Sequence, residues 1–312
     1  MDRFPALSNA SFAAHIADNR SLGIHRSGYN GVAALIPRHS GNNLFVPTYA
    51  GLNYETISLT GMPPYQAPGR TDHQAKFEPR GEAMHIEAAD EESVVLVQPP
   101  TRHAGVGARI EFWVEEPHYL HQDIELTFHK RFCPEDQASA FTSLWASYLH
   151  MPPDRHLYLK PDWRVGRERD GWVGLTKEGH GSTEYVTRPV PGERILDAAG
   201  HLEMMQQLEP VTAPEAGAAP GSPLAGGPLD FYYGLCWDQV FLMMFRQPEQ
   251  VRLAYSPNGG GTEPEWCPAW DYVLALDDAP VGSTHRWEIC LVVKSFASRI
   301  DVLDEVRRYQ EG

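Results

Sequence analysis

The sequence lacks the motifs that mark the common nucleotide-dependent and zinc-dependent enzymes. It has no phosphate-binding glycine loop, no dinucleotide-binding glycine fingerprint, no serine nucleophile elbow and no zinc helix with paired histidines. Its four cysteines (Cys133, Cys236, Cys267 and Cys290) stand far apart and match no zinc spacing. We therefore expect no cofactor and no structural zinc, and we predict free thiols in a reducing compartment.

Long apolar runs and basic clusters are also missing. The first 15 residues have no apolar core of signal-peptide length, and no later run approaches the roughly 18 apolar residues that span a bilayer. The formal net charge is −15 at pH 7, so most of the surface would repel a polyanion. We expect a soluble, cytoplasmic protein that binds neither nucleic acid nor membranes. Carbohydrates and other neutral small molecules remain open as ligands, and so does a homodimer.

Glycine and proline are frequent and scattered, which favours many short strands over long helices. The chain of 312 residues has 27 glycines and 26 prolines. The clearest strand is residues 118–131, where apolar and polar side chains alternate with period two. One face of this strand carries His121, Asp123, Glu125, Thr127 and His129. That polar face either meets water or lines a wide, wet binding groove.

Other segments give less regular signals. The first 20 residues suggest a short amphipathic segment, and residues 134–150 are compatible with a helix or with a strand. Residues 195–208 and 298–309 have helical spacing, the second behind a Ser298 N-cap. Residues 210–228 are of low complexity and predict a flexible insertion.

About a dozen expected strands, few helices and no alternation of strand and helix predict an all-β protein. The length exceeds an immunoglobulin-sized unit, so a large two-sheet sandwich fits best. We expect residues 1–312 to form a single domain of this kind, with a few short helices.

The stretch of residues 256–272 is the most conspicuous candidate for a binding loop. It joins two strand-like runs and contains three consecutive glycines, two glutamates and two tryptophans. Glu263 and Glu265 are candidates for a carboxylate base, and Trp266 and Trp270 offer flat faces that can stack on a sugar ring. The alternative is a long hairpin loop whose tryptophans fill the core.

Histidines outside this loop supply candidates for acid–base chemistry, because imidazole titrates near neutrality. His180 lies between glycines, and His150 follows an aromatic run, either as a buried turn residue or as a group at a strand end. Arg102 can bind hydroxyls or a carboxylate through its fork of donors. His121, Glu125 and His129 share a strand face about 13 Å apart, at ~3.3 Å per residue, so a metal there would need ligands from other strands.

Several segments, taken together, resemble the galactose-mutarotase-like superfamily of large β-supersandwiches. They are N-L-F-V-P-T-Y-A-G-L-N-Y-E at 43–55, the run from H-Q-D-I-E-L-T-F-H-K-R-F to S-L-W-A-S-Y-L-H at 121–150, S-P-N-G-G-G with P-A-W-D-Y at 256–272, and the late strand W-E-I-C-L-V-V-K-S-F. The resemblance implies sugar binding on a concave sheet, to which Asn53, His121, Glu125 and Trp237 are assigned as further sugar-binding residues.

In true mutarotases a histidine is the general acid, and a late glutamate, followed five residues later by a proline, is the general base. Glu263 and Pro268 keep that spacing, which makes Glu263 the first candidate for the base and Glu265 the second. The family's histidine-containing segment falls near residues 145–148, where no histidine stands, so His150 or His180 would replace it.

The resemblance therefore implies a sugar epimerase or isomerase that works by proton transfer between a histidine and a glutamate. Two alternatives remain. One is a lyase or hydrolase acting on a uronate or oxidised sugar, in which Arg102 pairs with the carboxylate. The other is a protein that binds carbohydrate without catalysis.

Overall fold

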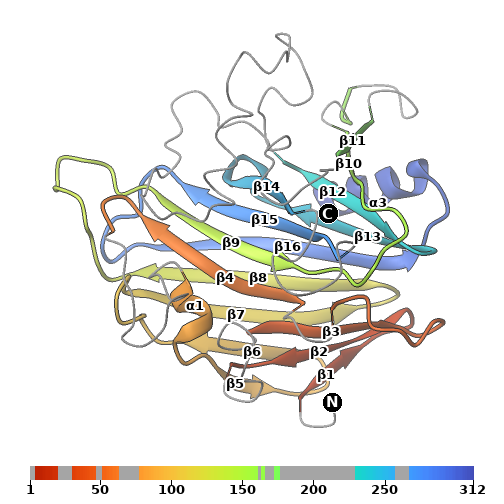
Figure 1. The fold of residues 1–312 in the computed structure, drawn as a ribbon, viewed down its shortest axis with the longest axis horizontal. Coiled ribbons are helices and arrows are strands. Elements are labelled where there is room, and N and C mark those ends of the chain that lie inside the picture. Colours follow the sequence, from red (N-terminus) through yellow and green to blue (C-terminus); the bar gives the residue numbers. More distant parts are fainter. Residues whose placement is uncertain are drawn as a thin grey trace.

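Two antiparallel β-sheets packed face to face form the protein, which we describe from a computed structural model (Figure 1). The structure describes residues 4–19, 30–46, 51–62, 77–160, 163–165, 172–175, 229–256 and 267–312. Within these ranges all the pairings between named strands are antiparallel. The prediction of an all-β, two-sheet sandwich is confirmed.

The first sheet has seven strands and combines the N-terminal part of the chain with three strands from its middle and end. In spatial order they are β1 (Ala6–Ser8), β2 (Phe12–Ala17), β3 (Gly31–Pro37), β4 (Leu52–Leu59), β9 (Phe141–Ser147), β15 (Ala269–Leu276) and β14 (Val251–Ser256). The amphipathic segment expected at the N-terminus is thus a pair of strands. The ambiguous segment 134–150 contains strand β9.

The second sheet has nine strands. In spatial order they are β11 (Val173–Leu175), β10 (Leu157–Leu159), β12 (Phe231–Cys236), β13 (Gln239–Phe245), β16 (Thr284–Ser295), β8 (Tyr119–Phe128), β7 (Val106–Glu115), β6 (Ser93–Gln98) and β5 (His85–Ala89). Strand β8 alternates between buried and more accessible residues, as the sequence predicts.

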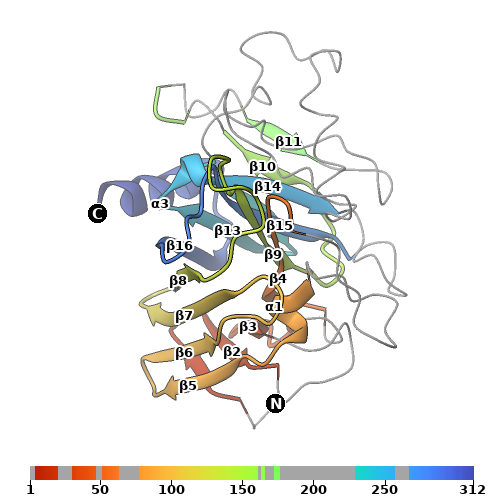
Figure 2. The ribbon, with the colours of Figure 1, turned by 90° about the vertical axis from the view of Figure 1, so that its left-hand side faces the viewer.

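Three helices are described besides the strands: α1 (Glu78–Gly81), the 3-10 turn η4 (Pro248–Gln250) and α3 (Arg299–Glu311). Figure 2 shows α1 and α3 on opposite sides of the sandwich. Ser298 caps α3 by accepting a hydrogen bond from the Asp301 amide, at 3.1 Å between Oγ and N, which confirms the predicted cap. The predicted helix 195–208 and the insertion 210–228 lie outside the described residues.

Aromatic residues fill the core between the two sheets. Trp145 of β9 stacks between Tyr54 of β4, at 5.4 Å between ring centroids, and Tyr272 of β15, at 6.2 Å. All three side chains are at most 1% exposed. Because successive side chains of a strand point to opposite faces, this inward stack turns the neighbouring residues of three strands outward.

Helix α3 covers part of the outer face of the nine-stranded sheet. Val302, Leu303 and Val306 pack against the buried outward side chains of β13 and β16. Glu305 fixes the helix further, because its carboxylate accepts hydrogen bonds from Tyr119, at 2.6 Å, and from His118, at 3.0 Å, and also binds Lys294. Burial raises the pKa of Glu305, but the hydrogen bonds from His118, Lys294 and Tyr119 outweigh this effect and lower that pKa to about 2.

The close contact of Gly234 in β12 with Trp270 in β15 gives a test of core packing. A Cβ atom at Gly234 would lie 2.3 Å from the indole ring, so Gly234→Ala forces the two sheets to shift. We expect a loss of about 1–3 kcal/mol in the free energy of unfolding, measured by urea denaturation. Gly107→Ala in β7 is the control, since its Cβ would meet Pro100 at an ordinary 3.6 Å and should cost nothing. Equal effects of the two substitutions would contradict this account.

Glu305 also predicts how stability depends on pH. Its folded pKa lies below the ordinary value of 4.5, so its contribution is complete above pH 4.5 and is lost as the pH falls toward 2. Between these limits the wild type should lose on the order of 2–3 kcal/mol more than Glu305→Gln, as measured by urea unfolding at several pH values. The exposed neighbour Asp304 provides the control, and Asp304→Asn should follow the wild type. Parallel pH curves for wild type and Glu305→Gln would refute the assignment.

Candidate functional site

The outer face of the seven-stranded sheet carries a second apolar cluster with polar residues set into it. We call it the outer-face cluster, and its apolar members are Val46, Leu144, Ala146, Tyr148, Ala254, Cys267, Ala269 and Val273, with Phe77 packed against them. Val46, Phe77 and Cys267 each stand next to a stretch outside the described residues. The stretch 257–266, which contains the predicted bases, therefore begins and ends beside this cluster.

A β-bulge places the carboxylate of Glu55 within this face. The register of β4 on β9 shifts between Tyr54 and Thr56, so Glu55 is an extra residue with no partner in the ladder. Its side chain is fully buried and forms an ion pair with the equally buried Arg80, at 2.8 Å between Oε1 and Nη1. The hydroxyl of Tyr148 donates to the same carboxylate, at 3.1 Å from Oε2.

Helix α1 positions Arg80, although four residues are too few to be stable alone. Side chains from distant segments bind its backbone: Asn30 and Gln98 donate to the carbonyl of Pro79, at 2.7 and 3.0 Å. The carboxylate of Glu78 accepts from the backbone amides of His103 and Ala104. These bonds fix the short helix against β4 and so fix the direction of the Arg80 side chain.

Arg80 has donors that the described protein groups leave unused. Its Nε and Nη2 atoms are buried and have no hydrogen-bond partner among the described residues. A buried guanidinium donor without an acceptor is costly, so an acceptor from water or a ligand would stabilise this face. Nearby, Asn53 donates to the carbonyls of Gly51 and Ala146, at 3.3 and 3.4 Å, and is fully buried.

His150 lies at the edge of the outer-face cluster. Tyr148 belongs to this cluster and Leu149 to the core between the sheets, and His150 follows them in a bend beyond the end of β9. Its ring is partly accessible, while Nδ1 is buried without a partner. His180, Glu263, Glu265 and Trp266 lie outside the described residues, and their roles remain predictions.

Three other predicted sugar-binding residues lie elsewhere. Trp270 is fully buried in the core between the sheets, where its ring meets Gly234, so it offers no face for stacking on a sugar. Trp237 is 46% exposed in the turn between β12 and β13, with a positive φ of 58°. Arg102 is exposed in the turn between β6 and β7, where its backbone carbonyl accepts from Lys130.

The polar face of β8 lies on the other sheet and divides into two parts. Beyond α3 it is an ion-paired surface: Arg286 binds Asp123, at 2.7 Å, and Glu125 is exposed. Near α3 the same face of β8 forms part of the wall of a pocket, and His121 is one of the residues that line it. The seven-stranded sheet therefore carries Asn53 and His150, and the nine-stranded sheet carries His121 and Glu125.

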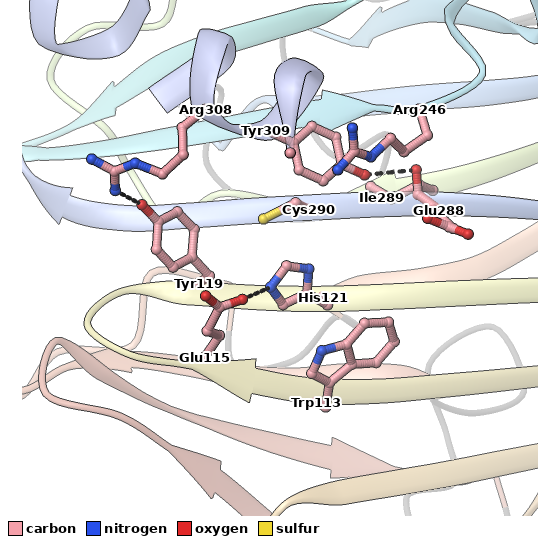
Figure 3. Close-up of a pocket in the computed structure, with 11 residues that line it drawn as sticks. Trp113, Glu115, Tyr119, His121, Arg246, Glu288, Ile289, Cys290, Arg308 and Tyr309 are labelled. Carbon is pink, nitrogen blue, oxygen red and sulfur yellow. Dashed lines mark hydrogen bonds and ion pairs between the residues drawn. The ribbon is translucent and has the colours of Figure 1, made fainter. Parts of the chain in front are cut away.

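The pocket beside α3, which we call the α3 pocket, has a volume of about 440 Å³ (Figure 3). His121 forms its floor, stacked on Trp113 at 5.0 Å between ring centroids and 3.0 Å from the carboxylate of Glu115. Burial lowers the pKa of His121, and the hydrogen bond and charge of Glu115 oppose this effect only in part. Burial also raises the pKa of the neighbouring Cys290 thiol well above its ordinary value, so the thiol is a poor nucleophile.

No group of three metal-ligating side chains comes together in the part of the chain that the structure describes. All four cysteines are free, as the sequence predicts. None of the described helices has the length and apolar character needed to cross a bilayer.

Glu55, Arg80 and Tyr148 were not among the residues expected from the sequence. A charged residue in the otherwise apolar and hydroxylic run L-N-Y-E-T-I-S-L was a usable signal for Glu55, because a buried strand carries a charge only when it is paired. Arg80 gave no such signal, since its partner lies 25 residues away and the contact depends on the bulge and on α1.

The two packed antiparallel sheets define a large β-sandwich, which is the fold that the predicted resemblance implies. Sequence comparison adds nothing, as neither a family model nor a curated protein matches the chain.

Among solved structures, the chain is similar to the α-N-acetylgalactosaminidase NagBb from Bifidobacterium bifidum, with a TM-score of 0.52 and 13% identity over 98% of this chain. It is also similar to an Escherichia coli K12 protein provisionally assigned as an aldose 1-epimerase, with a TM-score of 0.48 and 11% identity over 94% of this chain and 99% of that one. A third is heparan sulfate lyase HepC from Pedobacter heparinus, with a TM-score of 0.46 and 7% identity over 95% of this chain.

The chain spans only 38% of the length of NagBb and 37% of that of HepC. At 13% identity the likeness to NagBb shows the fold alone, and activity has to be argued from the site.

The ion pair of the outer-face cluster gives a test of its geometry. Arg80→Met leaves the Glu55 carboxylate buried without its cation, and we expect a loss of about 3–5 kcal/mol in unfolding free energy. Glu55→Gln combined with Arg80→Met should cost clearly less than the sum of the single substitutions, because both remove the same pair. The control is Arg109→Met, which breaks an exposed pair with Glu111 and should cost less than about 1 kcal/mol. Additive effects of the two buried substitutions would contradict the pairing.

Proposed function

We propose that this protein acts on a carbohydrate that binds over the outer-face cluster of the seven-stranded sheet. The observation that carries the proposal is the buried Glu55 carboxylate, which a bulge inserts into the sheet face and which Arg80 and Tyr148 hold in place. Sugars are bound by a few fixed polar groups set among apolar side chains, and the buried outer-face cluster, with Glu55, Arg80 and Tyr148, combines both kinds of group. The similarity in fold to structures named for activities on carbohydrates supports the same class of ligand.

The reaction that we propose is the epimerisation or isomerisation of a sugar by proton transfer. In the ring-opening version, a glutamate removes the proton from the anomeric hydroxyl while a histidine protonates the ring oxygen, and the bond between the anomeric carbon and the ring oxygen breaks. Rotation and the reverse steps give the other anomer, so no oxidant is consumed. Glu263 is our first candidate for the base and Glu265 the second, and His150 or His180 is the acid.

His150 is the candidate whose surroundings support the proposal most directly. It stands two residues after Tyr148, a member of the outer-face cluster, and the residue is partly exposed. Trp266 would offer a stacking surface from the adjoining loop, and Asn53 would belong to the same face. We retain the single-domain organisation and the insertion at 210–228 as parts of this proposal.

The test is the interconversion of sugar anomers by the full chain, followed by polarimetry and NMR over a panel of free aldoses. We expect a rate above the buffer background for at least one sugar. One of His150→Gln and His180→Gln should lower kcat by about 100-fold or more, because one of these histidines is the general acid. One of Glu263→Gln and Glu265→Gln should have a similar effect, because one of these glutamates is the general base. Glu111→Gln, in β7 of the opposite sheet, is the control and should keep full activity. A background rate with every sugar would reject the epimerase.

A second candidate is a lyase or hydrolase acting on a uronate or oxidised sugar. The unused Nε and Nη2 donors of Arg80 favour it, because they suit an acceptor-rich group such as a carboxylate. Acidic glycans incubated with the protein would then yield cleaved or unsaturated products. Binding of sugar without any turnover, unchanged in Glu263→Gln and His180→Ala, would instead indicate a carbohydrate-binding protein without catalysis.

A further inference from the structure

The α3 pocket is a second site, separate from the outer-face cluster. Its lining residues come from β7, β8, β13 and β16 of the nine-stranded sheet and from α3, whereas the outer-face cluster lies on the seven-stranded sheet. Its volume of about 440 Å³ falls within the range of about 300–1,000 Å³ that is usual for small-molecule sites. Nothing in the proposed sugar reaction uses this pocket.

Arg246 is the cation of the α3 pocket that is best placed to bind an anionic ligand. Arg246 lies over the ring of Tyr309, at 4.3 Å from the centroid, and within the described ranges no carboxylate lies within ion-pair distance of it. Arg308 binds Glu305 and Tyr119, yet its side chain is 63% exposed. The two acids have partners and are also exposed: Glu115 accepts from His121, and Glu288 lies 3.7 Å from Arg286. A guanidinium that lies over an aromatic ring can still bind a planar carboxylate through two parallel hydrogen bonds.

His121 adds an acceptor to this set of donors. Burial lowers the pKa of His121, which favours the neutral ring with one proton. The carboxylate of Glu115, at 3.0 Å from Nε2, requires that proton on Nε2, which leaves Nδ1 as an acceptor. Figure 3 shows this second ring nitrogen on the side of the ring away from Glu115, toward Glu288 and Ile289. A ligand hydroxyl group can donate to it.

We propose that the α3 pocket binds a small hydroxycarboxylate, such as a sugar acid, with its carboxylate on Arg246 and a hydroxyl group donating to His121. Trp113 and Tyr309 supply the aromatic surfaces on either side. The chemistry of the lining selects the ligand: a neutral sugar leaves Arg246 without its anion, and a simple carboxylate leaves His121 without its donor.

The experiment is a titration of the full chain with gluconate, glucuronate, glucose and acetate, followed by calorimetry and ligand-observed NMR. We expect at least one of the two sugar acids to bind about tenfold more tightly than glucose or acetate, because only a sugar acid satisfies both polar groups. Arg246→Gln should weaken that binding about tenfold or more, with the thermal melting curve unchanged. Arg109→Gln, on the same sheet face but outside the pocket, is the matched control and should bind like the wild type.

Three results would overturn the proposal: no binding of either sugar acid at millimolar concentrations, equal affinity for glucose, or full affinity in Arg246→Gln. Loss of binding in Arg80→Met with full affinity in Arg246→Gln would move the sugar acid to the outer-face cluster. The readout is binding, so an absence of epimerase turnover would reject the proposed function and leave this site standing.

Discussion

The stack of Tyr54, Trp145 and Tyr272 between the two sheets is the contact on which the rest of the arrangement depends. These rings come from three neighbouring strands and point inward together, so the adjacent residues of those strands must point outward. Glu55 follows Tyr54 and Asp271 precedes Tyr272, and both acids are buried on the outer face. The packing of the core therefore decides which polar groups reach the candidate site.

Each outer face of the sandwich carries apolar side chains that have to be kept from water, and the two sheets achieve this in different ways. On the nine-stranded sheet, α3 covers the apolar strip, and Glu305 binds the helix to the ends of β8 and β16. On the seven-stranded sheet, apolar residues surround a charged pair that four-residue α1 completes. The helix on the nine-stranded sheet leaves a pocket along its edge. On the seven-stranded sheet the polar groups belong to the sheet face itself.

The sequence predicts secondary structure best where one face of a helix or strand is buried and the other is exposed to solvent. Strand β8 alternates with period two, and α3 has helical spacing behind Ser298, so both were predicted correctly. Strand β9 is buried on both faces and has no alternation, which is why residues 134–150 remained ambiguous. Trp270 was assigned to the site for the same reason, since composition does not reveal which covered face a tryptophan occupies.

The candidate site was less predictable than the fold, because its contacts join distant segments. His150 and Asn53 were expected and lie on or beside the outer-face cluster, but the pairing of Glu55 with Arg80 depends on a bulge and on tertiary hydrogen bonds to α1. Such contacts leave no local pattern in the chain. Helix α1 was missed for that reason also, since side chains of Asn30 and Gln98 hold it rather than its own propensity.

The bulge at Glu55 has a consequence for how this chain can change. Tyr54 and Ile57 face the core and Thr56 faces outward, so a strand without Glu55 would alternate regularly and pair with β9 without interruption. The carboxylate is thus an insertion into an otherwise complete ladder. Deletion of one codon would remove the carboxylate and leave the inward side chains in register. It would also leave Arg80 buried without its anion, so the polar centre is lost without a large cost in stability only when Arg80 changes with it.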